Sequence, residues 1–376
     1  MGASGQGRTV SRRGRAWLPG ALAACLLALG GPGLMATPGA NQAFSPPLPA
    51  HAPAASDLPD ATTLEALRAR YRRPDSIPFP RDNPYSDAKY RLGQVLFFDP
   101  RLSGSNSMSC ASCHNPALGW EDGLRTARGE QANTLRRATQ TILNVAWAEP
   151  LMWDGRKESL EEQALGPVAD ADEMNQPIEA LVAELSRIPG YRRLFREAYG
   201  EERVTPEGIA RALATFQRTI VSNLSPFDRW VAGDPNAMGP EAVRGFVLFN
   251  TRANCAACHA GWRFTDDSFH DIGLPSEDVG RGAHLPDVPL MRHAFKTPTL
   301  RNIAARNPYM HDGSLATLRE VVTHYDTGFV DRPSLSPEMR RLNLSARDVD
   351  DIVAFLRALT SEDDPIPAPA LPTEEE

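Results

Sequence analysis

The stretches Cys110-Ala-Ser-Cys113-His114 and Cys255-Ala-Ala-Cys258-His259 share one pattern, in which two cysteines separated by two residues are followed directly by histidine. This is the attachment pattern of c-type haem. The two thiols form thioethers with the vinyl groups of the porphyrin, and the histidine then lies beneath the iron as its proximal ligand. The composition predicts roughly 0.001 such patterns by chance, so two occurrences predict two covalently bound haems.

Other uses of these cysteines fit the pattern poorly. A redox-active dithiol does not require histidine after its second cysteine. A zinc site built from the four motif thiolates would leave both histidines without a role. The fifth cysteine, Cys25, lies far from the other four, and five cysteines are too few for a disulfide scaffold in 376 residues.

A weak internal repeat precedes both patterns. Gly93-Gln-Val-Leu-Phe97 leads into the first cysteine pair, and Gly245-Phe-Val-Leu-Phe249 leads into the second. A short apolar helix therefore enters a haem-binding cluster twice, which indicates a duplicated module.

Helical periodicity continues along the chain. Thr205 followed by Pro206 marks a helix start, and the apolar residues at 209, 212, 213, 216 and 220 then share one face. Ser345 and Asp348 mark another start, before a buried stripe over 349–356. We therefore predict an all-α fold built from two haem-binding modules.

Length and composition set the expected boundaries. The chain has 376 residues, of which 41% are hydrophobic, enough for about two domains. We predict a signal peptide at 1–40, a proline- and alanine-rich segment at 41–82, haem domains at 83–224 and 225–362, and a disordered tail at 363–376.

The first 40 residues predict export. A basic stretch at 1–15, an apolar run at 16–29 and small residues at 30–40 follow the order of a secretory signal. The run is shorter than the roughly 20 residues of a spanning helix, so we expect a periplasmic protein with no membrane span in its mature form. Two alternatives stay open, because Cys25 fits lipoprotein anchoring and Arg12-Arg13 resembles a twin-arginine signal.

The chain is acidic. Its formal net charge is -7, and cleavage after residue 40 would remove four arginines and no acid, leaving -11. Nucleic-acid binding needs a basic face, so nucleic acid is not an expected partner.

Four longer stretches, at residues 96–123, 141–174, 255–273 and 295–322, resemble the bacterial di-haem cytochrome c peroxidase and MauG family in sequence and in order. The resemblance implies an all-α fold of two cytochrome c-like haem domains packed around an interdomain interface. The same resemblance implies a peroxidatic haem in the first domain, an electron-transfer haem in the second and a calcium ion between them. It also implies hydrogen peroxide as substrate. The electrons would come from a small redox protein, either a cytochrome c or a cupredoxin, or from a protein substrate.

Three residues of the first domain match the family's catalytic positions. The resemblance places Trp153 between the two haems, where an indole would divide one long electron transfer into two short ones. It makes Glu173 the distal carboxyl that moves a proton during peroxide cleavage, and it makes Gln163 a distal amide that holds peroxide or water. Pro167 matches a position that lines the pocket. Without the resemblance, Trp153 reads as a core residue and Glu173 as a solvated acid.

The sixth ligand of the second haem separates branches of the family. Alignment through Pro-Tyr-Met-His-Asp-Gly, residues 308–313, brings Tyr325 onto a position that is methionine in the peroxidase branch and tyrosine in the MauG branch. A phenolate is a hard anionic donor, which lowers the potential of the iron. The alternatives are Met310 and His324.

The first haem is expected to be open. Many family members carry a histidine about 16 residues after the proximal one, where it blocks peroxide until the second haem is reduced. This chain has Glu130 there, and no histidine lies between His114 and His259. We predict a reaction with peroxide that needs no prior reduction.

Other family positions differ. The asparagine that binds calcium is missing from Ala138-Thr-Gln-Thr141, so the ion would rely on water and on backbone carbonyls of Arg306 and Pro308. Ala253 stands where some relatives carry a surface tryptophan that receives electrons from a protein substrate. His270 and His311 lie in family motifs, and we expect them near the second haem.

Two classes of function remain after these comparisons of residues. The leading hypothesis is a periplasmic di-haem peroxidase, either a cytochrome c peroxidase or a MauG-like oxidase. The alternative is a non-catalytic di-haem electron-transfer cytochrome, which would have six-coordinate iron at both sites. A peroxide sensor with little turnover is a third possibility.

Overall fold

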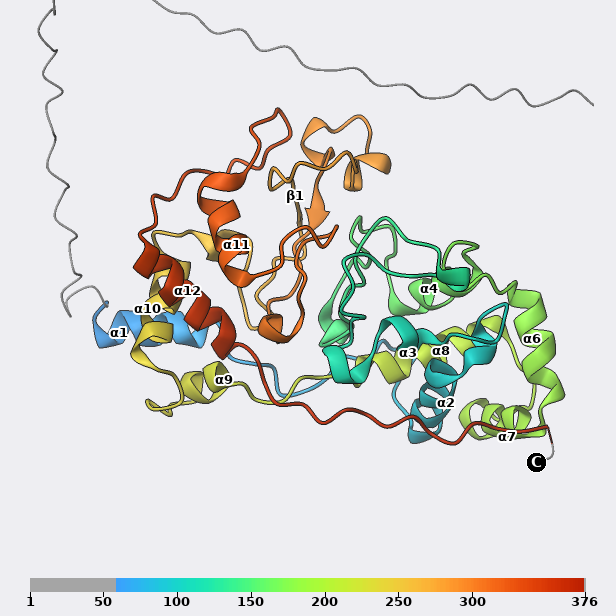
Figure 1. The fold of residues 1–376 in the computed structure, drawn as a ribbon. Coiled ribbons are helices and arrows are strands. Elements are labelled where there is room, and N and C mark those ends of the chain that lie inside the picture. The colour runs from blue at the N-terminus through green and yellow to red at the C-terminus, as the bar shows by residue number, and fades with distance from the viewer. Residues whose placement is uncertain (1–58, 375–376) are drawn as a thin grey trace, which may run out of the picture. The chain divides into compact units, whose positions relative to one another are not determined.

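The computed structural model describes residues 59–374 (Figure 1). The predicted signal peptide, Arg12-Arg13 and Cys25 lie outside the described residues. The helices are α1 Ala61–Ala69, α2 Asp87–Phe98, α3 Cys110–Cys113, α4 Leu160–Ala164, α5 Gly166–Ala169, α6 Ile178–Arg187, α7 Pro189–Tyr199, α8 Pro206–Arg218, α9 Pro226–Val231, α10 Pro240–Asn250, α11 Leu318–Thr323 and α12 Ala346–Ala358.

The first hydrophobic core is built around the crossing of α2 and α8. Thr205 caps α8 by accepting a hydrogen bond from Gly208, and Pro206 begins the helix as predicted. The two helices touch at Gly93, where an added Cβ would lie 2.0 Å from the backbone oxygen of Ala212. Only glycine permits this approach, which explains the glycine at the start of the first repeat.

The second core repeats this arrangement with α10 and α12. Ser345 and Asp348 form the predicted capping box of α12. An added Cβ at Gly245 would lie 1.9 Å from the backbone oxygen of Asp351. Phe216 and Phe355 also occupy matching places, each 2.8 Å from the added Cβ of its glycine. The internal repeat therefore corresponds to two helix crossings of the same kind.

The two ends of the described chain each pack on the other domain. Leu64 and Leu67 of α1 contact the second core, and Tyr71 is fully buried in it. Near the C-terminus, Ile366 and Leu371 contact the first core. Apolar side chains in residues 59–71 and 363–374 therefore each cover a core, and the segment and tail boundaries at 41–82 and 363–376 stay predictions.

Strand structure is limited to one short pair in the described residues. β1 (Phe269–His270) pairs antiparallel with β2 (Phe295–Lys296). The fold is thus mostly helical, with a small sheet that the all-α prediction did not include. Within residues 59–374, no helix is both long and apolar enough to cross a membrane.

Candidate functional site: two haem-attachment motifs around a shared tryptophan

The first motif forms a short helix and a turn. Cys110 and Cys113 begin and end α3, and His114 follows it. The Nδ1 of His114 donates to the backbone oxygen of Trp120 at 3.2 Å, which leaves Nε2 as the nitrogen that can bind iron. Burial lowers the pKa of His114, so the imidazole is neutral at neutral pH, as a metal ligand requires.

The second motif orients its histidine with the same kind of hydrogen bond. The Nδ1 of His259 donates to the backbone oxygen of the fully buried Phe264 at 2.8 Å. Burial again lowers the pKa of the histidine. All four motif cysteines carry free thiols, so each motif offers two sulfur atoms and one oriented imidazole. This donor set fits a covalently attached haem.

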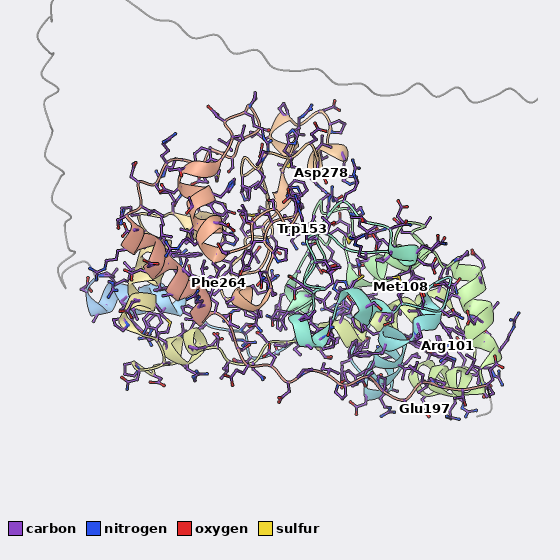
Figure 2. All side chains as sticks on the ribbon, viewed as in Figure 1. Arg101, Met108, Trp153, Glu197, Phe264 and Asp278 are labelled. Atoms are coloured by element: carbon purple, nitrogen blue, oxygen red, sulfur yellow. The ribbon has the colours of Figure 1, made fainter. Side chains whose placement is uncertain are left out.

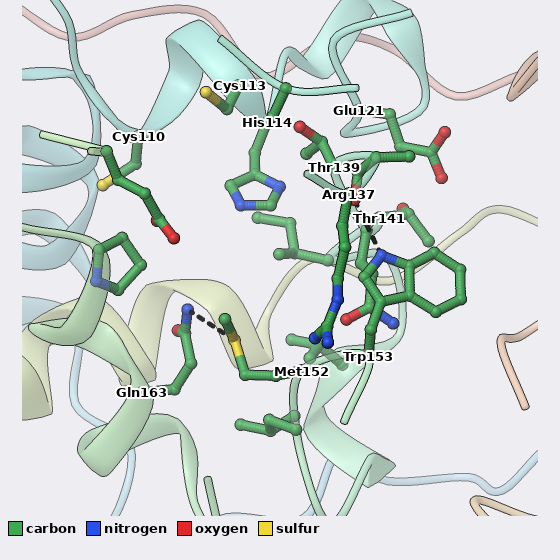
Figure 3. Close-up of a pocket in the computed structure, with 18 of the residues that line it drawn as sticks. Cys110, Cys113, His114, Glu121, Arg137, Thr139, Thr141, Met152, Trp153 and Gln163 are labelled. Atoms are coloured by element: carbon green, nitrogen blue, oxygen red, sulfur yellow. Dashed lines mark hydrogen bonds between the residues drawn. The ribbon is translucent and has the colours of Figure 1, made fainter. Parts of the chain in front are cut away.

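A cavity of about 720 Å³ lies beside the first motif. Cys110, Cys113 and His114 line it, and the Glu173 and Gln163 predicted from the sequence line it as well. In Figure 3 the ring of His114 points into the cavity, and Gln163 and Met152 lie across from it. The structure therefore brings the predicted proximal and distal groups together around one space. Pro167 and Trp153 also line this cavity, as the resemblance implied.

The distal carboxyl and amide have distinct environments. Burial, aided by the nearby Asp170, raises the pKa of Glu173 above its ordinary value. A raised pKa makes a carboxylate a stronger proton acceptor, which suits a group that takes up a proton and passes it on. The Nε2 of Gln163 lies 3.8 Å from the sulfur of Met152, so the amide is only weakly engaged by the protein.

Trp153 touches both domains. Its Nε1 donates to the backbone oxygen of Ala138 at 2.8 Å, and its own backbone oxygen accepts from Lys296 of β2 at 2.8 Å. The N–H of Ala138 donates to the backbone oxygen of His311 at 2.7 Å. Figure 2 shows Trp153 between Met108 of the first domain and Phe264 of the second. Trp153 is therefore hydrogen-bonded to backbone atoms of both domains.

An ion-pair cluster surrounds the tryptophan, and no sequence motif indicated it. Arg137 pairs with Asp278 of the second domain at 2.8 Å and with Asp154 at 2.7 Å. Arg137 also lies over the ring of Phe295, which stacks on His311 with 3.6 Å between ring centroids. The partners are far apart in sequence, so only the fold brings them together.

His311 belongs to this cluster as well. Its ring lies 6.4 Å from that of Trp153, centroid to centroid, at 70°. Burial lowers the pKa of His311 to about 4, so the ring is neutral at physiological pH. It therefore lies beside the interdomain tryptophan, which refines the expectation that it would lie near the second haem.

Tyr325 lies in a π-helical turn, η9 (His324–Gly328). Single π-helical turns are frequent at functional sites. Burial raises the pKa of Tyr325, and Cys258 and Cys255 add to the effect. The Nε2 of His324 lies 2.9 Å from the backbone oxygen of Ile272, so this nitrogen is already engaged. Tyr325 stays the predicted ligand of the second haem, with Met310 and His324 as the alternatives.

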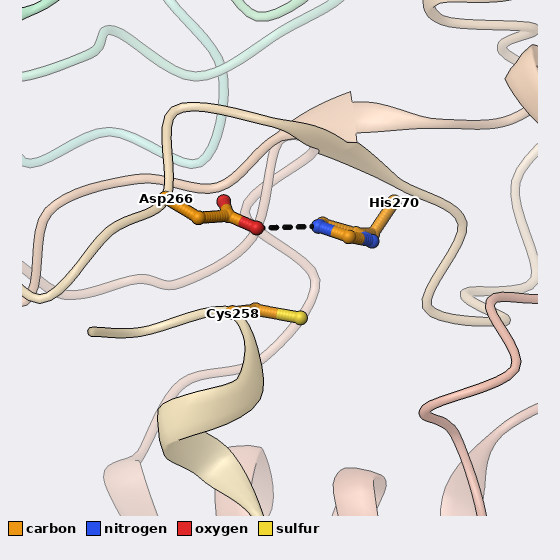
Figure 4. A group of neighbouring side chains, drawn as sticks. All are labelled: Cys258, Asp266 and His270. Atoms are coloured by element: carbon orange, nitrogen blue, oxygen red, sulfur yellow. Dashed lines mark hydrogen bonds and ion pairs between the residues drawn. The ribbon is translucent and has the colours of Figure 1, made fainter.

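His270 lies at the edge of the second motif. Its Nε2 donates to Asp266 at 2.8 Å, and Cys258 lies close to both side chains (Figure 4). Cysteine, carboxylate and histidine together resemble a small metal site. Since Cys258 belongs to the second haem motif, we interpret the Asp266–His270 pair as the rim of the haem site instead.

The segment expected to bind calcium lies at the contact between the two domains. Ala138 has no side-chain oxygen, so the expected ligands are water and the backbone carbonyls of Arg306 and Pro308. The guanidinium of Arg306 pairs with Glu121 of the first domain at 2.7 Å and donates to the backbone oxygens of Thr299 and Arg301. A calcium ion takes about six to eight oxygen ligands, so two carbonyls would need several waters to complete the site, and calcium stays a prediction.

Two cytochrome c-like domains, each with an oriented haem-binding motif, define a di-haem c-type cytochrome. Family models agree with this class. Residues 87–236 match the model described as di-haem cytochrome c peroxidase, and residues 242–360 match cytochrome c. The chain belongs to the di-haem cytochrome c peroxidase and MauG family, whose members carry haem cofactors.

Individual relatives refine this placement. The methylamine utilization protein MauG of Methylorubrum extorquens is 53% identical over 312 residues, covering 82% of this chain and 88% of the relative. The cytochrome c551 peroxidase of Nitrosomonas europaea is 37% identical, covering 75% and 82%. A crystal structure of a MauG-like protein associated with microbial copper homeostasis has a TM-score of 0.72 at 31% identity, covering 77% and 95%.

These relatives decide between the two classes of function. Both curated groups are enzymes or enzyme-like proteins of the di-haem peroxidase type. The chain is accordingly a di-haem peroxidase-like enzyme, and the non-catalytic electron-transfer cytochrome is not supported.

Proposed function

We propose that the protein is a periplasmic, MauG-like di-haem enzyme that reduces hydrogen peroxide beside His114. Two c-type haems are attached through Cys110 and Cys113 and through Cys255 and Cys258. The observation that carries the proposal is the single cavity that joins His114, Glu173 and Trp153. When bound, the first haem supplies an iron that holds peroxide and exchanges electrons with it. Each peroxide takes two electrons and two protons and leaves as two water molecules.

Three side chains of the first domain would carry out proton transfer, orientation of peroxide and electron transfer. Glu173 takes a proton from the proximal peroxide oxygen and returns it to the departing one, which its raised pKa favours. The weakly engaged amide of Gln163 orients the peroxide or the water that replaces it. Trp153 passes oxidising equivalents toward the second domain, with which it shares backbone hydrogen bonds.

We propose that Tyr325 gives the second haem its MauG-like character. His259 and the phenolate oxygen of Tyr325 would together hold the iron of this haem. A phenolate favours oxidised iron, so the second haem would store an oxidising equivalent instead of accepting electrons readily. The 53% identity to a MauG, against 37% to a cytochrome c peroxidase, supports this branch.

The molecule that donates electrons to the enzyme belongs to one of two classes. The proposed donors are a small cytochrome c or cupredoxin, or residues of a protein substrate. Ala253 occupies the position of the surface tryptophan of some relatives and is only 3% exposed. Electrons therefore enter by another route, and methylamine utilisation is not proposed for this chain.

The test is a rapid-mixing reaction of the fully oxidised protein with peroxide. We expect the spectrum of the haem to change within seconds without added reductant, because the first haem is open. A protein that reacts only after one-electron reduction would contradict the proposal and return the chain to the ordinary cytochrome c peroxidases.

A further inference from the structure

Glu130 is a buried carboxylate with no part in the proposed chemistry. Glu130 is only 4% exposed, and it directly follows Gly129, which lines the cavity. The carboxylate accepts a hydrogen bond from the backbone N–H of Ser105. An acidic side chain is rarely buried unless it is hydrogen-bonded, so this contact defines its role.

The backbone at Glu130 is joined directly to the segment that carries the distal carboxyl. The N–H of Glu130 donates to the backbone oxygen of Glu173 at 2.6 Å. An added Cβ at Gly129 would lie 1.8 Å from the backbone oxygen of Asp172. The two segments are therefore in contact at a position where only glycine fits.

A third segment closes the arrangement. The N–H of Gly104 donates to the backbone oxygen of Met174 at 2.9 Å, and an added Cβ at Gly104 would lie 2.4 Å from the backbone oxygen of Asn175. The side chain of Glu130 reaches Ser105 on this same segment. Residues 104–105, 129–130 and 172–175 are thus held together at one point.

The loop that carries Glu130 also reaches the first haem motif. The sulfur of Cys113 lies 3.7 Å from the backbone oxygen of Arg128. The loop is narrow, because the N–H of Gly129 donates to Asn133 at 2.9 Å and Arg128 donates to the hydroxyl of Thr134 at 2.6 Å. One side of the loop therefore contacts the attachment cysteine, and the other contacts the Glu173 segment.

We propose that Glu130 is a positioning residue that fixes Glu173 over the first haem. The inference rests on the proposed function, because it requires Glu173 to be the proton-transfer group. Proton transfer needs a heavy-atom separation of roughly 2.6–3.2 Å, and a misplacement of about 1 Å can lower a rate about 100-fold. The side chain of Glu130 limits such movement by joining the Glu173 segment to residues 104–105.

The test compares two substitutions in the haem-loaded protein. Glu130→Ala removes the hydrogen bond from Ser105 and should slow the reaction with peroxide roughly 10- to 100-fold. Glu130→Gln keeps an oxygen that accepts from the N–H of Ser105, and it should restore the rate to within about threefold of the wild type. Glu201→Ala, at an exposed position of the first domain, is the control and should leave the rate unchanged.

A double substitution separates positioning from general damage. If Glu130 acts through Glu173, Glu130→Ala combined with Glu173→Gln should react at the rate of Glu173→Gln alone. Full additivity of the two effects would overturn the inference, as would a wild-type rate for Glu130→Ala. A wild-type rate for Glu173→Gln would instead overturn the proposed role of Glu173.

A second variant keeps the test valid if Glu130→Ala fails to fold. Glu130→Asp keeps the carboxylate but shortens the side chain by one methylene group, which withdraws it from the N–H of Ser105. It should slow the reaction roughly three- to tenfold, and the pH profile should keep the inflection that Glu173 provides. An unchanged rate would overturn the inference.

Discussion

Replacing Arg306 with methionine should destabilise the protein strongly, because it leaves Glu121 charged and unpaired between the two domains. The guanidinium side chain is 4% exposed and the carboxylate side chain 14% exposed. At a charge separation of roughly 4 Å and an effective dielectric of about 20, the lost attraction is about 4 kcal/mol. This agrees with the roughly 3–5 kcal/mol that removal of one partner from a buried pair costs. At about 2–4 °C per kcal/mol, the melting temperature should fall by roughly 6–20 °C.

Denaturation of the haem-loaded protein in urea, followed by haem absorbance, measures this effect. Burial already raises the pKa of Glu121 despite the opposing effect of Arg306. When a carboxyl has a raised pKa in the folded state, the free energy of unfolding of the protein decreases as the pH rises through that pKa. Arg306→Met should therefore recover stability as the pH falls. Glu121→Gln combined with Arg306→Met should regain most of the loss. Arg319→Met, in an exposed pair with Asp350, should cost less than about 1 kcal/mol. A loss below about 1 kcal/mol for Arg306→Met would refute the reasoning.

Three further predictions concern the cavity and the interface. Glu173→Gln should slow the reaction with peroxide by about 100-fold or more. In the wild type, the rate should increase as the pH rises through the raised pKa of Glu173. A stopped-flow pH series of the variant should lack this inflection. Trp153→Phe loses the hydrogen bond to Ala138. Time-resolved absorbance should show an unchanged first reaction with peroxide but a slower spectral change of the second haem. Equal kinetics at both haems would exclude Trp153 as the route of electron transfer between them. Chelation with EDTA should leave peroxide turnover and haem spectra largely unchanged, since Ala138 offers no side-chain oxygen to hold the ion tightly. Loss of turnover that added calcium restores would contradict this.

Local patterns predicted much of the fold. The two haem motifs, the glycine repeat and the helix caps at Thr205 and Ser345 each depend on residues close together in sequence, and the structure contains all of them as expected. The packing of α1 on the second core could not be predicted in this way. Its apolar residues Leu64 and Leu67 indicate that a surface is buried, but not which one.

The same contrast between local sequence patterns and long-range contacts applies to the site. Glu173, Gln163 and Trp153 matched family positions and line one cavity. The oxygens that orient the two proximal histidines belong to the backbones of Trp120 and Phe264. Because every residue has a backbone oxygen, the sequence carries no signal for such a partner. Long-range ion pairs such as Arg137 with Asp278 lack any regular spacing for the same reason.

The most direct measurement of the central claim is electron paramagnetic resonance of the resting oxidised protein, compared with Tyr325→Met. The account predicts two ferric signals of equal intensity: a high-spin one from the haem at His114 and a low-spin one from the haem at His259, with only the second altered by the substitution. Two low-spin signals in the wild type, or a second signal that Tyr325→Met leaves unchanged, would contradict it.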